Sequence, residues 1–412
     1  MEESLDNGLS IKKNLIWNSV GNLIYLGTQW LFTYIVTILL GFTEAGVYAL
    51  AVSVCSTFYT IASYSMRNYQ ASDIERRYTD SEYTASRIVT SIIALIGCGV
   101  IVLFNRYDLE SASCIMVFML FKLTEAVSDV YQGSIQLRSR MDYIGISFAF
   151  RGIATLVTFI VLLISTKSLV RALVGVTLAS SFIVFLYDRN KAHGLAYNSS
   201  ISPGNVLSLL KACFPTAAYG LLFAAAGQLP RMAIESTAGT EALGFYSSIA
   251  MPVSIIQISA SFLFAPLVTP LAESLEKGNT DSFFSIIWKV VLGMAAIALV
   301  GLLGVAICGD WFYGLLFGEK IAPYVSLAAP LAICSVLVAL GWFLATVVTV
   351  MRGLNLLMGL SSIMFAVIAI SSTWSIQQYG LNGATTVYII GLLIFCTGCT
   401  VSISRYARQK AK

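Results

Sequence analysis

Four charged side chains lie within long apolar stretches of the sequence. Lys122, Glu125 and Asp129 follow one another at spacings that place them on one face of a helix, and Arg151 lies in the next apolar stretch. Charge inside a membrane is costly and normally faces a cavity. The two cations are therefore predicted to bind one anionic ligand, and Glu125 and Asp129 are candidates for ion coupling. The alternative interpretation is an ion-pair ladder that only packs helices together.

A stripe of polar residues follows the first apolar stretch. Its members are three or four residues apart, so they occupy a single helix face that is not expected to contact lipid: Asn14, Asn18, Asn22, Tyr25 and Gln29. Two interpretations remain open. The amides either hydrogen-bond between helices or form the wall of a passage that binds sugar hydroxyls. In the second case Asn22 and Gln29 are candidates for substrate binding.

Membrane-spanning helices must position these residues. Of the 412 residues, 57% are apolar and 11% are charged, whereas a soluble domain carries roughly 25% charged residues. Apolar stretches of bilayer length predict an all-α integral membrane protein with about twelve spans. The spans are expected near residues 14–40, 44–66, 84–104, 111–133, 143–165, 168–187, 206–234, 242–271, 283–308, 324–351, 354–374 and 381–404.

The distribution of positive charge predicts the orientation of these spans. Most of the 25 Lys and Arg residues fall on the same side of the predicted spans as the N-terminus. Cytoplasmic loops retain positive charge and translocated loops are depleted in it. We therefore expect both the N-terminus and the C-terminus to be cytoplasmic.

A short motif occurs twice, about half the chain apart. Residues 43–48 read Thr-Glu-Ala-Gly-Val-Tyr, and residues 240–246 read Thr-Glu-Ala-Leu-Gly-Phe-Tyr. Each copy follows the first span of a six-span half. Parallel repeats of this kind occur in transporters that bind substrate between their halves. We expect one six-helix bundle over residues 1–200 and a second over residues 201–412.

The sequence lacks the residues that several other kinds of chemistry require. The eight cysteines lie in apolar runs and the chain has a single histidine, His193, so neither a metal site nor a redox site is predicted. No phosphate-binding loop is present, which argues against direct use of ATP. The balance of 25 basic and 21 acidic residues gives no case for nucleic acid as a partner. These features indicate a transporter without a cofactor rather than an enzyme.

Three motifs accompany the twelve predicted spans. Residues 12–15 read Lys-Lys-Asn-Leu, residues 41–48 read Gly-Phe-Thr-Glu-Ala-Gly-Val-Tyr, and Leu-Pro-Arg at 229–231 precedes Gly-Thr-Glu-Ala-Leu-Gly-Phe-Tyr-Ser at 239–247. With them the chain resembles the Wzx-type polysaccharide flippases of the multidrug/oligosaccharidyl-lipid/polysaccharide (MOP) superfamily. The likeness covers essentially the whole chain.

This resemblance implies two six-helix bundles in the bacterial inner membrane that move substrate by alternating access. The implied substrate is an undecaprenyl-diphosphate-linked oligosaccharide, such as an O-antigen repeat unit of lipopolysaccharide. A cationic cavity would accept its diphosphate and sugar while the polyprenyl tail stays in membrane lipid, and Lys122 and Arg151 fit that role. Arg231 occupies a position where similar sequences commonly carry a basic residue after an acid, although Pro230 precedes it here. A polysaccharide polymerase and a chain-length regulator are the implied protein partners.

The nearest alternative in the same superfamily is a cation-coupled exporter of drugs or other small molecules. Its cationic substrates would require acidic groups inside the N-terminal half. The first span contains no acid, although Glu125 and Asp129 lie in the fourth. With Lys122 and Arg151 near the middle of the membrane, an anionic substrate is the better electrostatic match.

Overall fold

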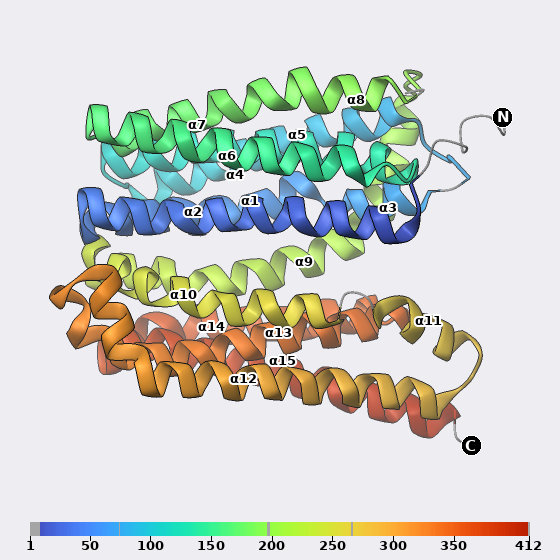
Figure 1. Cartoon of the computed structure of the whole chain (residues 1–412). Helices are drawn as coiled ribbons and strands as arrows, with labels where there is room; N and C mark the ends of the chain where they lie inside the picture. The colour runs from blue at the N-terminus through green and yellow to red at the C-terminus, as the bar shows by residue number, and fades with distance from the viewer. Residues whose placement is uncertain (1–8, 74, 196–197, 265–266, 411–412) are drawn as a thin grey trace. The chain divides into compact units, whose positions relative to one another are not determined.

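The computed structural model describes residues 9–73, 75–195, 198–264 and 267–410, and this part of the chain is predominantly helical (Figure 1). Twelve of its helices are long and apolar enough to cross a membrane, which confirms the predicted all-α membrane fold. The spans are Lys12–Leu40, Phe42–Ala71, Asp80–Asn105, Leu109–Leu137, Met141–Thr166, Leu169–His193, Pro203–Ala238, Thr240–Ala260, Thr280–Phe317, Glu319–Val350, Leu354–Tyr379 and Leu381–Tyr406.

The chain divides into two compact units, Met1–Leu221 and Leu222–Lys412. The first unit contains α1 (Ile11–Leu40), α2 (Phe42–Ser63), α3 (Met66–Ser72), α4 (Asp80–Asn105), α5 (Leu109–Leu137), α6 (Met141–Thr166), α7 (Leu169–Ile183), η1 (Val184–Asp188) and α8 (Arg189–His193). The second contains α10 (Thr240–Phe264), α11 (Val268–Glu276), α12 (Thr280–Phe317), η3 (Glu319–Leu327), α13 (Ala328–Val350), α14 (Leu354–Tyr379) and α15 (Leu381–Lys410). The boundary falls within α9 (Pro203–Ala238). A domain boundary at residue 200 remains a prediction.

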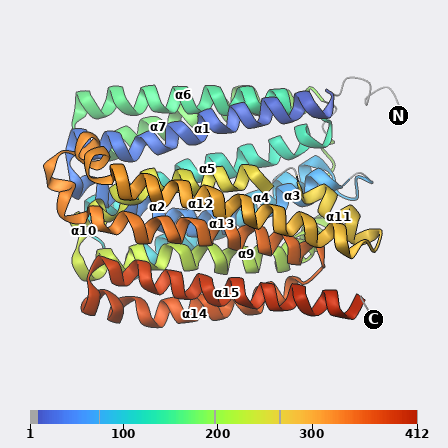
Figure 2. The same ribbon diagram turned by 60° about the horizontal axis from the view of Figure 1, so that its bottom comes forward.

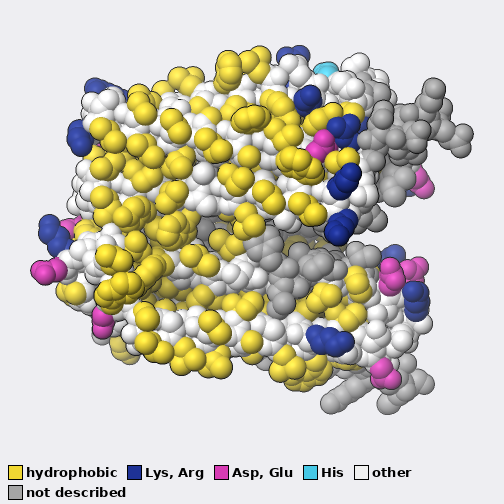
Figure 3. All heavy atoms as spheres, viewed as in Figure 1, with side chains coloured by type: hydrophobic (Ala, Val, Ile, Leu, Met, Phe, Trp, Pro, Cys, Tyr) yellow, Lys and Arg dark blue, Asp and Glu magenta, His cyan; other side chains and the backbone are white. Residues whose placement is uncertain are grey.

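Hydrophobic side chains cover the sides of the helices, and charged side chains gather near the helix ends (Figure 3). Leu103 is 79% exposed and Ile370 is 82% exposed. Extended apolar surface of this kind is unfavourable in water and is stable against the hydrocarbon core of a bilayer. The exposed apolar sides of the helices are therefore suited to contact lipid.

The repeated sequence motif corresponds to a repeated turn. Gly41 separates α1 from α2 with φ 99°, and Gly239 separates α9 from α10 with φ 88°. Glycine adopts this backbone conformation without the steric penalty of a side chain. Tyr48 and Tyr246 end the two copies of the motif, and each is 3% exposed. Each half of the sequence therefore contains a pair of helices joined by a turn at a glycine.

In the first unit α1 packs closely along α6 (Figure 2). A Cβ atom on Gly145 would lie 2.2 Å from the carbonyl oxygen of Trp17, and a Cβ on Gly21 would lie 2.3 Å from that of Gly145. Helix backbones approach this closely only where side chains are absent. The contact fixes α1 against α6, the helix that carries Arg151.

We expect Gly145→Ala to destabilise the protein by about 1–3 kcal/mol, because the added methyl group forces α1 and α6 apart. Gly99 in α4 provides a matched control, since no atom lies within 4 Å of its Cβ position. Gly99→Ala should be neutral or stabilising by up to about 1 kcal/mol. Thermal unfolding of the two variants in detergent tests this, and equal melting temperatures would contradict it.

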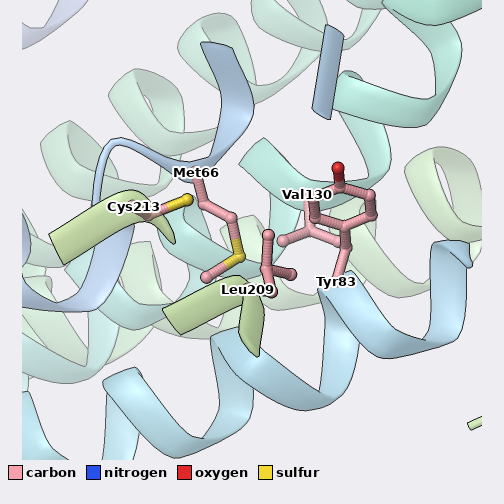
Figure 4. Close-up of a cluster of buried hydrophobic side chains, with 5 residues drawn as sticks. All are labelled: Met66, Tyr83, Val130, Leu209 and Cys213. Atoms are coloured by element: carbon pink, nitrogen blue, oxygen red, sulfur yellow. The ribbon is translucent and has the colours of Figure 1, made fainter. Parts of the chain in front are cut away.

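A buried cluster joins α3, α4 and α5 to the start of α9 (Figure 4): Met66, Tyr83, Val130, Leu209 and Cys213. α3 begins after Tyr64 and Ser65, which have φ values of 50° and 51°. Two successive left-handed residues end α2 and redirect the chain. The sequence predicts a single span over 44–66, and this break is the feature it does not anticipate. As a result Arg67, the second residue of α3, reaches α5.

In the second unit α14 packs along α15, and α13 packs against both α10 and α15 (Figure 2). A Cβ on Gly383 would lie 2.1 Å from the carbonyl oxygen of Ser375, so α14 and α15 also meet where a side chain is absent. The hydroxyls of Tyr246 and Thr385 are 3.1 Å apart and connect α10 to α15. Polar contacts of this kind contribute to helix association within the membrane.

Candidate functional site

The first unit contains a half-open cavity of about 360 Å³ lined by α1, α2, α3, α5 and α6. Six of the seven residues predicted to bind substrate or ions line it: Asn22, Gln29, Lys122, Glu125, Asp129 and Arg151. Arg67 and Gln132 add further polar groups, and its aromatic walls are Tyr25, Tyr48, Tyr59, Phe118 and Phe148. Residues that are far apart in the sequence therefore converge on one site.

Glu125 is neutralised within this cavity. Lys122 Nζ donates to Glu125 Oε2 at 2.7 Å, and the hydroxyl of Tyr25 donates to the other oxygen of the same carboxylate. The Lys122 ammonium also lies 5.4 Å from the ring centres of Phe118 and Phe121, a favourable position for cation–π attraction. Glu125 and Lys122 are thus one ion pair on α5, set among aromatic rings.

Asp129 pairs with cations from two other helices. Arg87 Nη2 of α4 lies 2.8 Å from Asp129 Oδ2, and Arg67 Nη1 of α3 lies 3.4 Å from Asp129 Oδ1. Arg87 is 1% exposed and also donates to the carbonyl oxygen of Ala62 at 2.7 Å. Asp129 therefore ties α5 to α3 and α4, and it makes no ion pair with Lys122 among the described contacts. The ion-coupling role of Glu125 and Asp129 remains a prediction.

Arg151 differs from Arg67 and Lys122, the other cations that line the cavity, because no ion pair engages it among the described residues. Its side chain is buried, and Nε and Nη1 have no hydrogen-bond partner in the described part of the chain. The guanidinium carbon lies 4.8 Å from the ring centre of Tyr25 and 5.4 Å from that of Phe148. A buried cation with unused donors has the charge and the hydrogen-bonding capacity to bind an anion.

The charges that line the cavity have a net positive sign. Arg67, Lys122 and Arg151 face two carboxylates, those of Glu125 and Asp129. Arg87 adds a further positive charge behind Asp129. Because low-dielectric walls strengthen electrostatic attraction, the excess charge favours an anionic ligand.

The polar stripe of α1 is divided between a helix contact and the wall of the cavity. Asn14 Nδ2 donates to the carbonyl oxygen of Leu9 at 2.9 Å, and Asn14 Oδ1 accepts from the amide of Met141 at 2.9 Å. This end of the stripe connects α1 to the start of α6. Further along, Asn22 and Gln29 face the cavity, and Gln29 Nε2 has no partner among the described residues.

Arg231 belongs to the second unit and is not one of the residues that line this cavity. It is half-buried on α9, near enough to Tyr246 and Tyr388 to interact with them electrostatically. Its substrate-binding role stays a prediction. No group of three or more metal-ligating side chains occurs in the parts of the chain that the structure describes.

Two functional candidates escaped the sequence analysis. Arg67 and Arg87 were not among the predicted site residues, yet both pair with Asp129. Arg87 lies inside the predicted span 84–104, which is a signal that could have identified it as an intramembrane cation. Arg67 gave no such signal, because it follows the predicted second span and reaches α5 only through the unexpected break before α3.

Solved structures of low sequence identity share this fold. Lipid II flippase MurJ, in an inward closed conformation, matches with a TM-score of 0.74 and 9% identity over 94% of this chain and 87% of that one. The eukaryotic MATE transporter AtDTX14 matches at 0.66 with 15% identity, covering 97% of this chain and 98% of its own. A MOP superfamily transporter from Pyrococcus furiosus matches at 0.65 with 13% identity over 97% of both chains. The protein thus has the fold of the MOP transporters.

The sequence itself assigns the family. Residues 11–272 match the model of the polysaccharide biosynthesis protein family, and the chain belongs to that family. No curated protein sequence matches it significantly. The chain thus combines membership of a polysaccharide biosynthesis family with a fold seen in MOP transporters.

Proposed function

We propose that this protein flips an undecaprenyl-diphosphate-linked oligosaccharide from the cytoplasmic to the periplasmic leaflet of the bacterial inner membrane. The observation that carries the proposal is Arg151, a buried cation whose Nε and Nη1 donors point to no protein acceptor among the described residues. The diphosphate supplies the missing acceptors. O-antigen repeat units are one substrate of this class.

The size and lining of the cavity support a polar headgroup as its occupant. A volume of about 360 Å³ falls at the lower end of the range for ligand pockets, which suits a diphosphate with its adjoining sugar. Asn22 and Gln29 offer amides to sugar hydroxyls, and the aromatic walls offer flat apolar faces. The polyprenyl chain would remain in lipid while the protein alternates between a cytoplasm-facing and a periplasm-facing state.

The ion pairs of the cavity argue against a cation-coupled drug exporter. Such a protein needs an acidic group free to bind a cationic substrate. Glu125 is engaged by Lys122, and Asp129 is engaged by Arg87 and Arg67. The anionic ligand is therefore the better match to this cavity. A polysaccharide polymerase and a chain-length regulator are the partners that the family suggests, and both remain part of the proposal.

The location of lipid-linked sugars tests the proposed function. In a strain that lacks the gene, a glycan-binding probe should label inverted membrane vesicles strongly and intact cells weakly, because repeat units accumulate in the cytoplasmic leaflet. The cloned gene should restore labelling of intact cells. Unchanged labelling in the deletion strain, together with raised sensitivity to cationic drugs, would favour the exporter instead.

A further inference from the structure

An open groove with a volume of about 210 Å³ runs between α1 and α6, and all of the residues that line it are apolar. Phe150 and Ile153 of its wall are 58% and 53% exposed. On α1 the groove extends from Trp17 to Ile24, about 10 Å of helix, which fits within one leaflet of a hydrocarbon core about 30 Å thick. The groove therefore has the lining and the length to hold part of a lipid chain.

Backbone contact between α1 and α6 separates this groove from the charged cavity. Val20 lines the groove, whereas Asn22 lines the cavity. Side chains two residues apart point in directions about 200° apart around an α-helix. Between the two hollows the helices touch, because a Cβ atom on Gly21 would lie 2.3 Å from the carbonyl oxygen of Gly145. The groove is therefore suited to a lipid other than the molecule whose headgroup occupies the cavity.

Aromatic rings connect the groove to a lysine. The ring of Phe150 meets the ring of Tyr187 edge to face, with centres 6.3 Å apart. Lys191 Nζ lies 5.8 Å from the ring centre of Tyr187 and 4.7 Å from that of Tyr143. Tyr143 is the third residue of α6, so this ammonium lies at the end of the groove where α6 begins. A lysine near a helix end usually extends into water, whereas these two rings hold its charge beside the groove.

The charge of Lys191 is not compensated by an acid. It makes no ion pair within the described part of the chain. Arg140 lies 4.1 Å from the ring centre of Tyr143, but its guanidinium is paired with Asp142 at 2.9 Å. Lys191 is therefore the cation beside these rings that can still pair with an anion.

A second lysine lies at the same end of the groove. Asn14 Oδ1 accepts from the amide of Met141 at 2.9 Å, so α1 and α6 begin side by side. Lys13 is exposed and precedes Trp17 by four residues, which places both side chains on one face of α1. Trp17 is 43% exposed, and tryptophan favours the headgroup level of a bilayer. The groove therefore ends at two cations on the predicted cytoplasmic side.

We propose that this groove binds one anionic glycerophospholipid of the cytoplasmic leaflet. An acyl chain lies along Ile24 and Ile153, and the phosphate pairs with Lys191 and Lys13. Positive charge at cytoplasmic helix ends is general in membrane proteins, but an ammonium held over rings that border an apolar groove matches a single lipid molecule. The inference does not depend on the proposed function, because it assigns nothing to the cavity.

Native mass spectrometry on the full-length protein in a non-ionic detergent tests the inference. The probes are phosphatidylglycerol and phosphatidylcholine with identical acyl chains, which differ in headgroup charge. We expect one bound phosphatidylglycerol with a Kd about tenfold lower than that of phosphatidylcholine, because a charge-assisted contact contributes about this factor. Equal Kd values for the two lipids in the unmodified protein would overturn the inference without the use of any variant.

A substitution at the lysine tests the headgroup contact. Lys191→Gln should weaken binding of phosphatidylglycerol about tenfold and leave binding of phosphatidylcholine unchanged. Lys289→Gln is the matched control, because Lys289 is an exposed lysine on α12 in the second unit, outside the groove. It should change neither Kd. A preference for phosphatidylglycerol that survives in Lys191→Gln would contradict the assigned headgroup site.

Two further variants test the position of the chain. Ile153→Trp fills the groove and should weaken binding of both lipids at least about tenfold, the effect of displacing about two methylene groups. Ile96→Trp is its control, since Ile96 is 61% exposed on α4 and lies outside the groove. Phosphatidylglycerol with brominated chains should also quench tryptophan fluorescence less in Trp17→Phe than in the unmodified protein.

The results that would overturn the inference leave the proposed function untouched. Lipid binding that Ile153→Trp does not weaken, or quenching that Trp17→Phe does not reduce, would remove the chain from the groove. Polyprenyl phosphate that displaces phosphatidylglycerol and loses affinity in Ile153→Trp would assign the groove to the transported lipid instead. Failure of flipping, in contrast, would concern Arg151 and the cavity, and the phospholipid site would stand.

Discussion

Replacing Arg151 by alanine is expected to reduce flipping about 100-fold per molecule of folded protein, with a smaller loss of stability because the side chain packs on Tyr25 and Phe148. The guanidinium offers Nε and Nη1 to an anion, and loss of charge-assisted hydrogen bonds to a diphosphate costs about 3 kcal/mol, which corresponds to about 100-fold in affinity. Because no ion pair in the described chain depends on Arg151, its removal leaves no carboxylate newly stranded in contact with it. The measurement is surface glycan on intact cells, with protein abundance and melting temperature determined in parallel.

Two further substitutions sharpen this test. Arg171→Ala is the matched control, because Arg171 is an exposed arginine at the start of α7, outside the cavity. It should leave flipping unchanged. Arg151→Lys should restore only part of the activity, since lysine keeps the charge but loses the planar donor geometry. Normal surface glycan in cells that carry Arg151→Ala would remove this residue from the substrate site.

Asp129→Asn is expected to destabilise the protein by about 3–5 kcal/mol, because it leaves the buried Arg87 guanidinium without its carboxylate. Arg87 is 1% exposed and lies 2.8 Å from Asp129. An amide keeps the shape of the side chain but not its charge. The loss of stability therefore measures the contribution of the charge. Thermal unfolding in detergent, followed by circular dichroism, measures the effect.

The exposed pair Glu273–Lys277 in the second unit provides the control. Its atoms lie 3.3 Å apart, and both side chains are more than half exposed. Glu273→Gln should change stability by less than about 1 kcal/mol, as is usual for surface ion pairs. If Asp129→Asn melts at the temperature of the unmodified protein and only transport is lost, Asp129 acts in ion coupling rather than in holding α3, α4 and α5 together.

Hydropathy and helical spacing were sufficient to predict much of this protein. The twelve spans follow from apolar stretches of bilayer length, and the structure contains twelve helices of that kind in its described part. The polar stripe on α1 and the charged face of α5 were predictable because side chains three or four residues apart lie on the same face of any α-helix. Because intramembrane charge must find a cavity or a partner, Lys122, Glu125, Asp129 and Arg151 were recognisable as candidates from the sequence.

The partners of those charges were not predictable from spacing along one helix. Lys122 and Glu125 are neighbours on α5, and their pairing was foreseeable. The pairing of Asp129 with Arg87 and Arg67 depends on the break at Tyr64 and Ser65 and on the packing of α3 and α4 against α5. Contacts of that kind arise between helices distant in the sequence, so periodicity carries no information about them.

The sequence by itself therefore determined that the chain spans the membrane about twelve times, that its halves repeat, and that cations and acids lie inside the membrane. Tertiary structure alone decided which of those charges are cancelled. Glu125 and Asp129 are held in ion pairs, whereas Nε and Nη1 of Arg151 have no hydrogen-bond partner among the described residues. The physical reason is that the free energy of a buried charge depends on groups within a few ångströms in space, and helix packing selects those groups.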